Sequence, residues 1–426
     1  MELVELEITN VAHGGIFVAR HEGRVIFVSD AISGERVLAQ VTDTSQKSFW
    51  RATTVKVLEP SKQRQAHVWS AASVERAPDE RVGGAELGHI KLGYQRELKA
   101  QVLTEALERF AHISKPVTVE GLPGDDETTG TLWRTRISLH VDDAGRVGPY
   151  AARSHRVIEV DDLPLAVDEI TALAPLHSKL PAGSRVDLVA PSVGGARINT
   201  VAPVEKKAKK KPGPGNPVAV PKLKNRALIR EKVGDREFVL AEDGFWQVHR
   251  SAAATLTQAV ASAIDGDLFD VRAANHDLYG GVGLLAAAMG DRFGSTTRMT
   301  SVESSEQATE FAAENLADWV GARVLTGRVD RYLTQVATDT SAAEKSAWSA
   351  ATVILDPPRA GAGKDVIESL GMLKPAQLVY VACDPVAFAR DAGYLRERGY
   401  ELSDLRAFDL FPNTHHVEAV ARFVRI

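Results

Sequence analysis

The sequence contains a single cysteine, Cys383, among 426 residues. One thiol excludes a disulfide framework, a zinc site built from several cysteines, and an iron–sulfur cluster held by the chain's own thiolates. We therefore expect no metal ion and no cluster. A lone thiol in an intracellular chain is either a small core residue or a candidate nucleophile, and the spacing alone leaves both open.

Long apolar runs are absent as well. No stretch has the length needed to span a bilayer, and residues Met1–Glu5 lack the basic and apolar regions of a signal peptide. We therefore expect a cytoplasmic protein without a membrane partner. The formal net charge is −5, so any binding of nucleic acid must depend on local basic surface and not on the overall charge.

The chain is long enough for two or three domains, and residues 1–60 predict a small one. Short alternating apolar runs are separated there by glycine-containing turns. They lie at Leu3–Ile8, Ile16–Arg20, Val25–Val28, Arg36–Val41 and Ala52–Leu58. Five short strands with such turns are typical of a β-barrel of the oligonucleotide-binding type.

Residues 61–240 predict a central α+β domain. Apolar residues recur at helical spacing over Tyr94–His112, and strands are expected at Trp133–Val141, Arg156–Val160 and Arg185–Val189. A loop rich in lysine, proline and glycine occupies 203–222, a composition that cannot form a core. Such a loop is either a solvated spacer or a segment that binds phosphates electrostatically.

Residues 241–426 alternate strands and helices, which indicates a doubly wound, Rossmann-like parallel sheet and an α/β protein. The expected strands are His276–Leu278, Arg298–Val302, Arg323–Thr326, Thr352–Leu355, Leu378–Ala382 and a C-terminal pair near Tyr400–Ala407 and Val417–Val424. The expected helices are Arg250–Ala263, Leu284–Ala288, Ser305–Leu316, Lys364–Leu370 and Ala387–Arg398.

The segment Asp277–Gly283 closes an expected strand and opens a helix, with glycines that let a ligand approach the backbone. The next strand ends in Glu303, and an acid at that position suits paired ribose hydroxyls. The dinucleotide fingerprint requires a further glycine about where Ala286 stands. An adenosine-containing cofactor is therefore expected, S-adenosyl-L-methionine more than a dinucleotide.

An acid and the thiol each follow a buried strand. Asp356 begins the segment Asp-Pro-Pro-Arg, and Cys383 begins Cys-Asp-Pro. Because the carboxyl ends of parallel strands meet at one edge of a sheet, both would lie where open α/β sheets bind ligands. Asp-Pro-Pro also resembles a turn of amino-methylating enzymes, but Arg359 stands where those enzymes have an aromatic residue.

Together these segments resemble the RNA 5-methyluridine methyltransferase family, whose members methylate carbon 5 of uridine in tRNA or ribosomal RNA. The matching segments follow the family's order and are Phe245–Val248, Asp277–Gly283, Val302–Glu303, Asp356–Arg359, Val381–Pro385 and Phe411–Glu418. The string from His13 to Glu35 resembles a TRAM domain, an RNA-binding module, although a barrel that binds nothing is the alternative. The resemblance spans nearly the full chain.

The resemblance implies a role for each of six side chains. Cys383 would be the nucleophile and Glu418 the base, and S-adenosyl-L-methionine would be held by Gln247, Tyr279, Glu303 and Asp356. A thiolate that adds to carbon 6 of uracil makes carbon 5 nucleophilic, and a base must later remove the carbon-5 proton. The target base must also leave its stack, with Phe411 and Trp246 as candidate supports.

The chain departs from the family in its middle domain and beside the cofactor strand. Many relatives carry four cysteines for an iron–sulfur cluster, whereas Val82–Ala85 and Leu163 occupy the corresponding stretches here. Packing must therefore hold that domain together. Asn275 and His276 stand where apolar residues are usual, and Gly280 replaces a frequent cysteine, so cofactor binding could be weaker.

RNA is the expected partner of a monomeric enzyme. Ribosomal RNA is preferred over tRNA as the substrate, because relatives that carry a TRAM domain often act there. Two alternatives remain open from the sequence. One is a catalytically idle RNA-binding or folding factor, and the other is a methyltransferase that acts on another base or on a small molecule.

Overall fold

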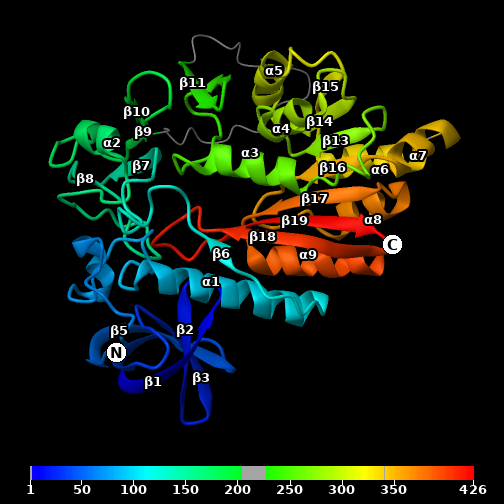
Figure 1. Cartoon of the computed structure of the whole chain (residues 1–426). Coiled ribbons are helices and arrows are strands. Elements are labelled where there is room, and N and C mark those ends of the chain that lie inside the picture. The colour runs from blue at the N-terminus through cyan, green and yellow to red at the C-terminus, as the bar shows by residue number, and fades with distance from the viewer. Residues whose placement is uncertain (1, 204–226, 340) are drawn as a thin grey trace, which may run out of the picture.

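The computed structural model describes residues 2–203, 227–339 and 341–426. Figure 1 shows a small barrel at the N-terminal end, a long helix beside it, and a large mixed sheet that carries the C-terminus. A second, smaller sheet of four strands belongs to the middle region. The structure is thus an α/β protein with a separate barrel, as the sequence predicted.

Five strands close the N-terminal barrel in the order β1-β2-β3-β5-β4. They are β1 (Leu3–Ala12), β2 (Ile16–His21), β3 (Arg24–Ser29), β4 (Arg36–Asp43) and β5 (Phe49–Glu59). Alternate residues of each strand point inward, so that Phe17, Ile26 and Val37 are completely buried. All five predicted strands are confirmed.

Helix α1 (Leu92–Ala106) connects the barrel with the large sheet. Leu98 packs into the barrel core, whereas Leu103 and Ala106 pack with the core of the large sheet. The helix continues as one wide turn over Leu107–Ala111 and ends at a left-handed residue. The predicted helix over Tyr94–His112 is confirmed, and its two faces belong to two different cores.

A four-stranded antiparallel sheet in the order β10-β9-β7-β8 forms the centre of the middle region, flanked by a short helix. These elements are β7 (Arg136–Val141), β8 (Val147–Gly148), α2 (Asp168–Leu173), β9 (Arg185–Val189) and β10 (Arg197–Val201). The strand predicted over Arg156–Val160 is wrong. Its side chains are partly buried, but its backbone joins no ladder and forms a single bridge from Val157 to Tyr150.

In the middle region, apolar packing occupies the stretches where many relatives carry the cysteines of an iron–sulfur cluster. Val82, Ala85 and Leu163 are buried in one apolar cluster with Trp69 and Trp133. The lysine-rich loop predicted at 203–222 lies outside the described residues, apart from Pro203. A hairpin of β11 (Leu228–Val233) and β12 (Arg236–Ala241) follows it and packs against helix α5 (Glu306–Asn315) through Asn315.

The large sheet has eight strands in the order β15-β14-β13-β16-β17-β19-β18-β6. Its strands are β6 (Val119–Glu120), β13 (Asn275–Leu278), β14 (Met299–Glu303), β15 (Ala322–Thr326), β16 (Thr352–Leu355), β17 (Gln377–Ala382), β18 (Tyr400–Phe408) and β19 (Glu418–Arg425). The first five in the spatial order are parallel, and β19 runs antiparallel between β17 and β18.

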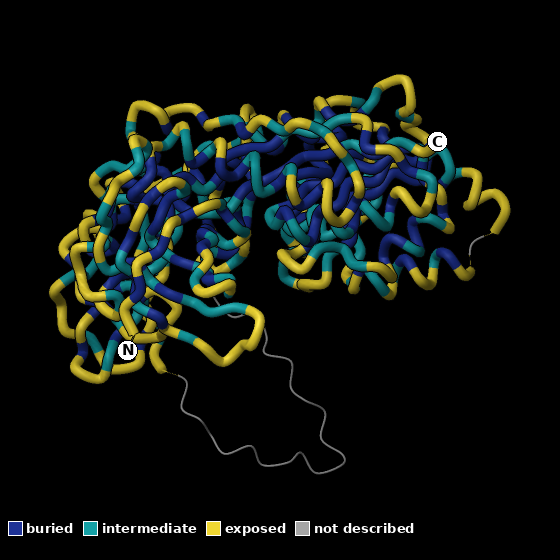
Figure 2. The backbone as a smooth tube through the Cα atoms, turned by 90° about the horizontal axis from the view of Figure 1, so that it is seen from below, coloured by how far each residue is buried: buried dark blue, intermediate teal, exposed yellow. Residues whose placement is uncertain are grey.

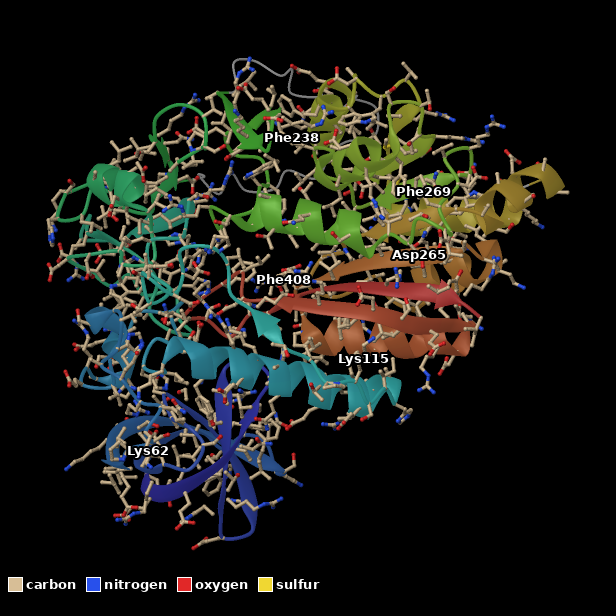
Figure 3. The ribbon with its side chains drawn as sticks, in the orientation of Figure 1. Lys62, Lys115, Phe238, Asp265, Phe269 and Phe408 are labelled. Carbon is tan, nitrogen blue, oxygen red and sulfur yellow. The ribbon has the colours of Figure 1, made fainter. Side chains whose placement is uncertain are left out.

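Strand β6 comes from the segment after α1 and extends this sheet at its outer edge. It pairs with the end of β18, where Phe408 is labelled in Figure 3. Arg406 donates two hydrogen bonds to the carboxylate of Glu120, at 2.9 and 2.8 Å. The middle region therefore contributes a strand to the large sheet.

Helices cover both faces of the large sheet, which makes it doubly wound. They are α3 (Ala252–Ala263), α4 (Leu284–Phe293), α5 (Glu306–Asn315), α6 (Val329–Asp339), α7 (Ala342–Ser349), α8 (Lys364–Leu373) and α9 (Pro385–Glu397). Helices α3 and α4 share one core with the sheet, and α6, α8 and α9 share another. Figure 2 shows buried segments in the interior of this part of the molecule, with half-buried and exposed segments around them.

The predicted strands and helices of residues 241–426 are confirmed to within a few residues at their ends, while α6 and α7 were not predicted. Among the described residues, none of the helices combines the length and apolar character needed to cross a bilayer.

Candidate active site

A cavity of about 880 Å³ opens at the carboxyl edge of the parallel strands. The strand order reverses between β13 and β16, and open α/β sheets bind ligands at such a switch point. All six side chains singled out from the sequence line this one cavity: Gln247, Tyr279, Glu303, Asp356, Cys383 and Glu418.

The register of two strands brings Cys383 and Glu418 together. Strands β17 and β19 pair antiparallel with Ala382 opposite Ala419. Cys383 follows Ala382 and Glu418 precedes Ala419, so the two residues face each other one position beyond this pair. The thiol is only partly buried, whereas Glu418 is 5% exposed.

Burial changes the proton affinity of the acids in the cavity. Burial raises the pKa of Glu418 well above its usual range, the charge of Asp356 raises it further, and Arg359 opposes the shift. Burial alone raises the pKa of Asp356 to about 7. Both carboxyls therefore bind protons more tightly than an exposed acid does.

The same surroundings hold the thiol in its neutral form. Burial raises the pKa of Cys383 to about 12, and the charges of Glu418 and Asp356 add to the shift. Arg359 works in the opposite direction. Without a ligand, the thiol is therefore protonated near neutral pH.

The turn after β13 is shaped for close approach of a ligand. Tyr279 adopts a left-handed conformation with φ of 64°, and Gly281 and Gly283 also have positive φ. A Cβ atom on Gly280 would lie 2.1 Å from Oγ of Ser301, so a side chain at this position would clash. A cysteine at this position would therefore require the side chains of Ser301 and Asp277 to move.

Glu303 is held at the end of β14 by three hydrogen bonds. Oε1 accepts from Oγ of Ser304 at 2.9 Å and from the backbone N–H of Ser305 at 2.8 Å. Oε2 accepts from the backbone N–H of Gly281 at 3.3 Å. A carboxylate accepts about four hydrogen bonds, so Glu303 keeps the capacity to bind ribose hydroxyls, and the cavity fits an adenosine cofactor.

Comparisons with known proteins identify relatives of this chain. Residues 232–425 match the family model described as tRNA (uracil-5-)-methyltransferase, and residues 2–49 match that of the TRAM domain. The chain is 37% identical to an uncharacterized RNA methyltransferase of Streptomyces avermitilis, over 99% of this chain and 98% of that protein. The chain belongs to the RNA uracil-5-methyltransferase family. It is accordingly an enzyme that uses S-adenosyl-L-methionine to methylate carbon 5 of uracil in RNA.

Two further relatives have named substrates. The chain is 28% identical to the 23S rRNA (uracil(1939)-C(5))-methyltransferase of Shewanella sediminis, over 99% of this chain and 95% of that protein. The crystal structure of Pyrococcus abyssi tRNA (uracil-54, C5)-methyltransferase with S-adenosyl-L-homocysteine has a TM-score of 0.68 and 21% identity, covering 99% of this chain and all of that one. At 21% identity, the likeness to the Pyrococcus abyssi structure shows that this uracil-5-methyltransferase shares its fold.

The unusual residues beside the cofactor strand are accounted for by packing. Nδ2 of Asn275 donates to two backbone carbonyls, and Oδ1 accepts from the N–H of Thr352 at 2.8 Å. His276 bonds to the hydroxyl of Tyr332 at 2.8 Å and stacks on Trp348 with ring centroids 4.0 Å apart. Both polar side chains are satisfied inside the fold, and neither lines the cavity of this methyltransferase.

The structure changes one expectation about aromatic support and adds one residue. Trp246 is buried against Phe238 and does not line the cavity, whereas Phe411 does. Phe245, the neighbour of Trp246, is 75% exposed at the cavity's edge. No local pattern in the sequence indicates which of these two aromatic residues faces the cavity, because the burial of Trp246 depends on its contact with Phe238.

Arg134 from the middle region also reaches the cavity. It was not singled out from the sequence, because the nearest matched segment, Phe245–Val248, lies more than 100 residues further along the chain. Only the fold brings the two together. His416 lines the cavity too, and burial lowers its pKa to about 3. The imidazole of His416 is therefore neutral near pH 7.

Proposed function

We propose that this enzyme methylates carbon 5 of a uridine in structured RNA through a covalent bond between Cys383 and carbon 6 of the uracil ring. The observation that carries the proposal is the pairing of Cys383 with Glu418 across β17 and β19, inside the cavity that also contains the candidate cofactor residues. Ribosomal RNA is the preferred substrate, because a relative that matches over nearly its whole length is named for 23S rRNA.

The two groups divide the reaction between them. The thiolate of Cys383 adds to carbon 6, and the electron pair of the ring's double bond moves onto the carbon-4 carbonyl oxygen as an enolate. Carbon 5 is then nucleophilic and accepts the methyl group. Glu418 next removes the proton from carbon 5, the bond between sulfur and carbon 6 breaks, and the double bond returns.

A raised proton affinity suits Glu418 for this second step. A carboxylate whose charged form is poorly solvated is a stronger base than an exposed one. The proton that Glu418 removes comes from a carbon atom, so extra basicity in the ionised form favours the transfer.

The cofactor residues have complementary tasks. S-adenosyl-L-methionine supplies an activated methyl group on a positively charged sulfonium. Glu303 is positioned to accept from the ribose hydroxyls, and Tyr279 and Gln247 border the same space. Asp356 offers negative charge near the thiol, where it would favour a sulfonium. A cytoplasmic location and a monomeric state remain predictions from the sequence.

Trapping with 5-fluorouridine tests the covalent step. We expect RNA that contains 5-fluorouridine, transcribed with the 23S rRNA sequence of the source cell, to form a complex with the enzyme that survives denaturing electrophoresis. Fluorine cannot leave as a proton, so the adduct persists after methyl transfer. The Cys383→Ala variant should form none and should lose methyl transfer by at least about 10⁴-fold.

Glu418→Gln provides the matched variant. It keeps the shape of the side chain but cannot remove the carbon-5 proton. RNA that contains ordinary uridine should therefore remain attached to Cys383 after methyl transfer. Full methylation of cellular RNA by Cys383→Ala would contradict the proposal, as would a Glu418→Gln enzyme that turns over at the normal rate.

A further inference from the structure

The turn between β1 and β2 of the barrel touches the segment that carries Cys383. Nε2 of His13 lies 2.9 Å from Oδ2 of Asp384, the residue directly after the thiol. Asp384 is also the N-cap of α9, since its Oδ1 accepts from the backbone N–H groups of Val386 at 3.1 Å and Ala387 at 2.8 Å. The carboxylate of Asp384, the residue after Cys383, thus links the barrel to helix α9.

The same turn touches the segment that leads to Glu418. Gly15 has φ of 69°, and a Cβ atom built on it would lie only 2.8 Å from Cβ of His415. The ring of His415 packs against that of His416 with centroids 4.0 Å apart, and His416 lines the cavity. Two residues further on, β19 begins with Glu418.

We propose that the turn 13–15 of the barrel is a positioning element of the active site, with His13 acting through Asp384 to fix Cys383 opposite Glu418. The inference rests on the proposed function, because it assumes that these two residues perform the chemistry. It gives the barrel a task in addition to any contact with RNA: the barrel completes the support behind both reacting groups.

Two observations separate this role from ordinary stabilisation. His13 is 44% exposed and the side chain of Asp384 is 23% exposed, and ion pairs with that much solvent contribute little to stability. Asp384 keeps both of its capping bonds to α9 without His13. Loss of His13 should therefore affect the orientation of the Cys383 segment more than the stability of the fold.

The test compares His13→Ala, His13→Gln and the parent enzyme in single-turnover methylation. Total RNA from a strain that lacks the enzyme serves as substrate, with radiolabelled S-adenosyl-L-methionine. We expect His13→Ala to slow the chemical step on the order of ten-fold, with KM for the RNA and for the cofactor changed less than about two-fold. Glutamine can still donate to Asp384, so His13→Gln should restore most of the rate.

His21→Ala is the matched control, because His21 is on β2 of the same barrel and its side chain has no hydrogen bond to any described residue. Thermal unfolding of each variant shows whether the fold is intact. An unchanged rate in His13→Ala would overturn the inference, and so would a loss confined to the KM for RNA. Cys383→Ala is run in parallel: if it still methylates, the proposed function itself has failed, whereas an inactive Cys383→Ala beside a normal His13→Ala defeats only the positioning role.

Discussion

Cys383 lies among carboxylates, so its ionisation must depend on what else enters the cavity. The charges of Glu418 and Asp356 both raise its pKa, and the charge of Arg359 lowers it. A positive charge brought close to the sulfur would stabilise the thiolate. The methyl donor carries such a charge, so the nucleophile is expected to become reactive when the donor is already bound.

This expectation can be measured because the chain has one thiol. With no ligand, alkylation by iodoacetamide should rise about ten-fold per pH unit from pH 7 to 10 without a plateau, since the pKa lies above this window and the thiolate fraction grows throughout. Saturating S-adenosyl-L-methionine should move the profile to lower pH than the neutral S-adenosyl-L-homocysteine does. Mass spectrometry of the labelled peptide gives the rates.

S-adenosyl-L-homocysteine also serves as the steric control, because it fills the same space without the charge. Identical profiles with the two ligands would contradict the charge argument. A plateau below pH 8 in the free enzyme would contradict the raised pKa of Cys383.

The candidate residues chosen from the sequence line one cavity, and the reason is geometric. Each of Tyr279, Glu303, Asp356 and Cys383 follows or ends a parallel strand, and such ends meet at one edge of the sheet. The sequence could not show the protonation of the thiol, which depends on burial and on acids from three separate segments. Nor could it show which of Phe245 and Trp246 faces the cavity.

At the scale of elements, the glycines of two helices differ in what surrounds them. Gly290 in α4 is packed against Trp319, and a Cβ atom there would lie 2.1 Å from the indole Nε1. Gly93 in α1 has nothing within 4 Å of the corresponding position. The first glycine is required for α4 to approach the segment before β15, and the second is not required by packing.

Alanine substitutions test this difference. Gly290→Ala should lower the free energy of unfolding by roughly 1–3 kcal/mol, because the added methyl group overpacks a buried site. Gly93→Ala should leave stability unchanged or raise it by up to about 1 kcal/mol, because it restricts the unfolded chain. Urea denaturation measures both, and equal effects in the two variants would contradict the packing argument.

The elements that the sequence missed are those whose signal is weak or unusual. Helix α6 buries Val329, Leu333 and Ala337, a narrow apolar stripe at helical spacing among polar residues. The hairpin of β11 and β12 turns through Gly234 and Asp235, a two-residue connection that could have been recognised. Strand β6 is two residues long and forms only because β18 offers an open edge, which no local pattern can indicate.

At the scale of the whole molecule, a buried ion pair joins α1 to the loop before Glu418. Nζ of Lys99 bonds to Oδ1 of Asp409 and donates to the carbonyl oxygen of Phe411 at 3.1 Å. Burial lowers the pKa of Lys99, against the opposing charge of Asp409. Both side chains are at most 1% exposed, so neither charge can turn to solvent if the other is removed.

Lys99→Met should therefore be strongly destabilising. It removes the nearer cation from the buried carboxylate of Asp409 and leaves only Nε of Arg96, 3.7 Å from Oδ2. Breaking a buried ion pair typically costs about 3–5 kcal/mol. Lys115→Met is the control, because Lys115 is a partly exposed lysine after α1 whose one hydrogen bond to a described residue goes to the carbonyl oxygen of Ser403. Its loss should change stability by less than about 0.5 kcal/mol. Urea denaturation of the two variants checks the prediction, and similar midpoints would contradict it.

The two-faced helix α1 also constrains how this chain can assemble during synthesis. The barrel has all its strands within the first 59 residues and can close as soon as they leave the ribosome. The other half of α1 contacts a core that includes Phe423, which is translated more than 300 residues later. Leu103 of this helix and Leu107 of the turn that continues it therefore wait for their complete core until the last strand is made. Until then the nascent protein exposes apolar surface to aggregation and to chaperones.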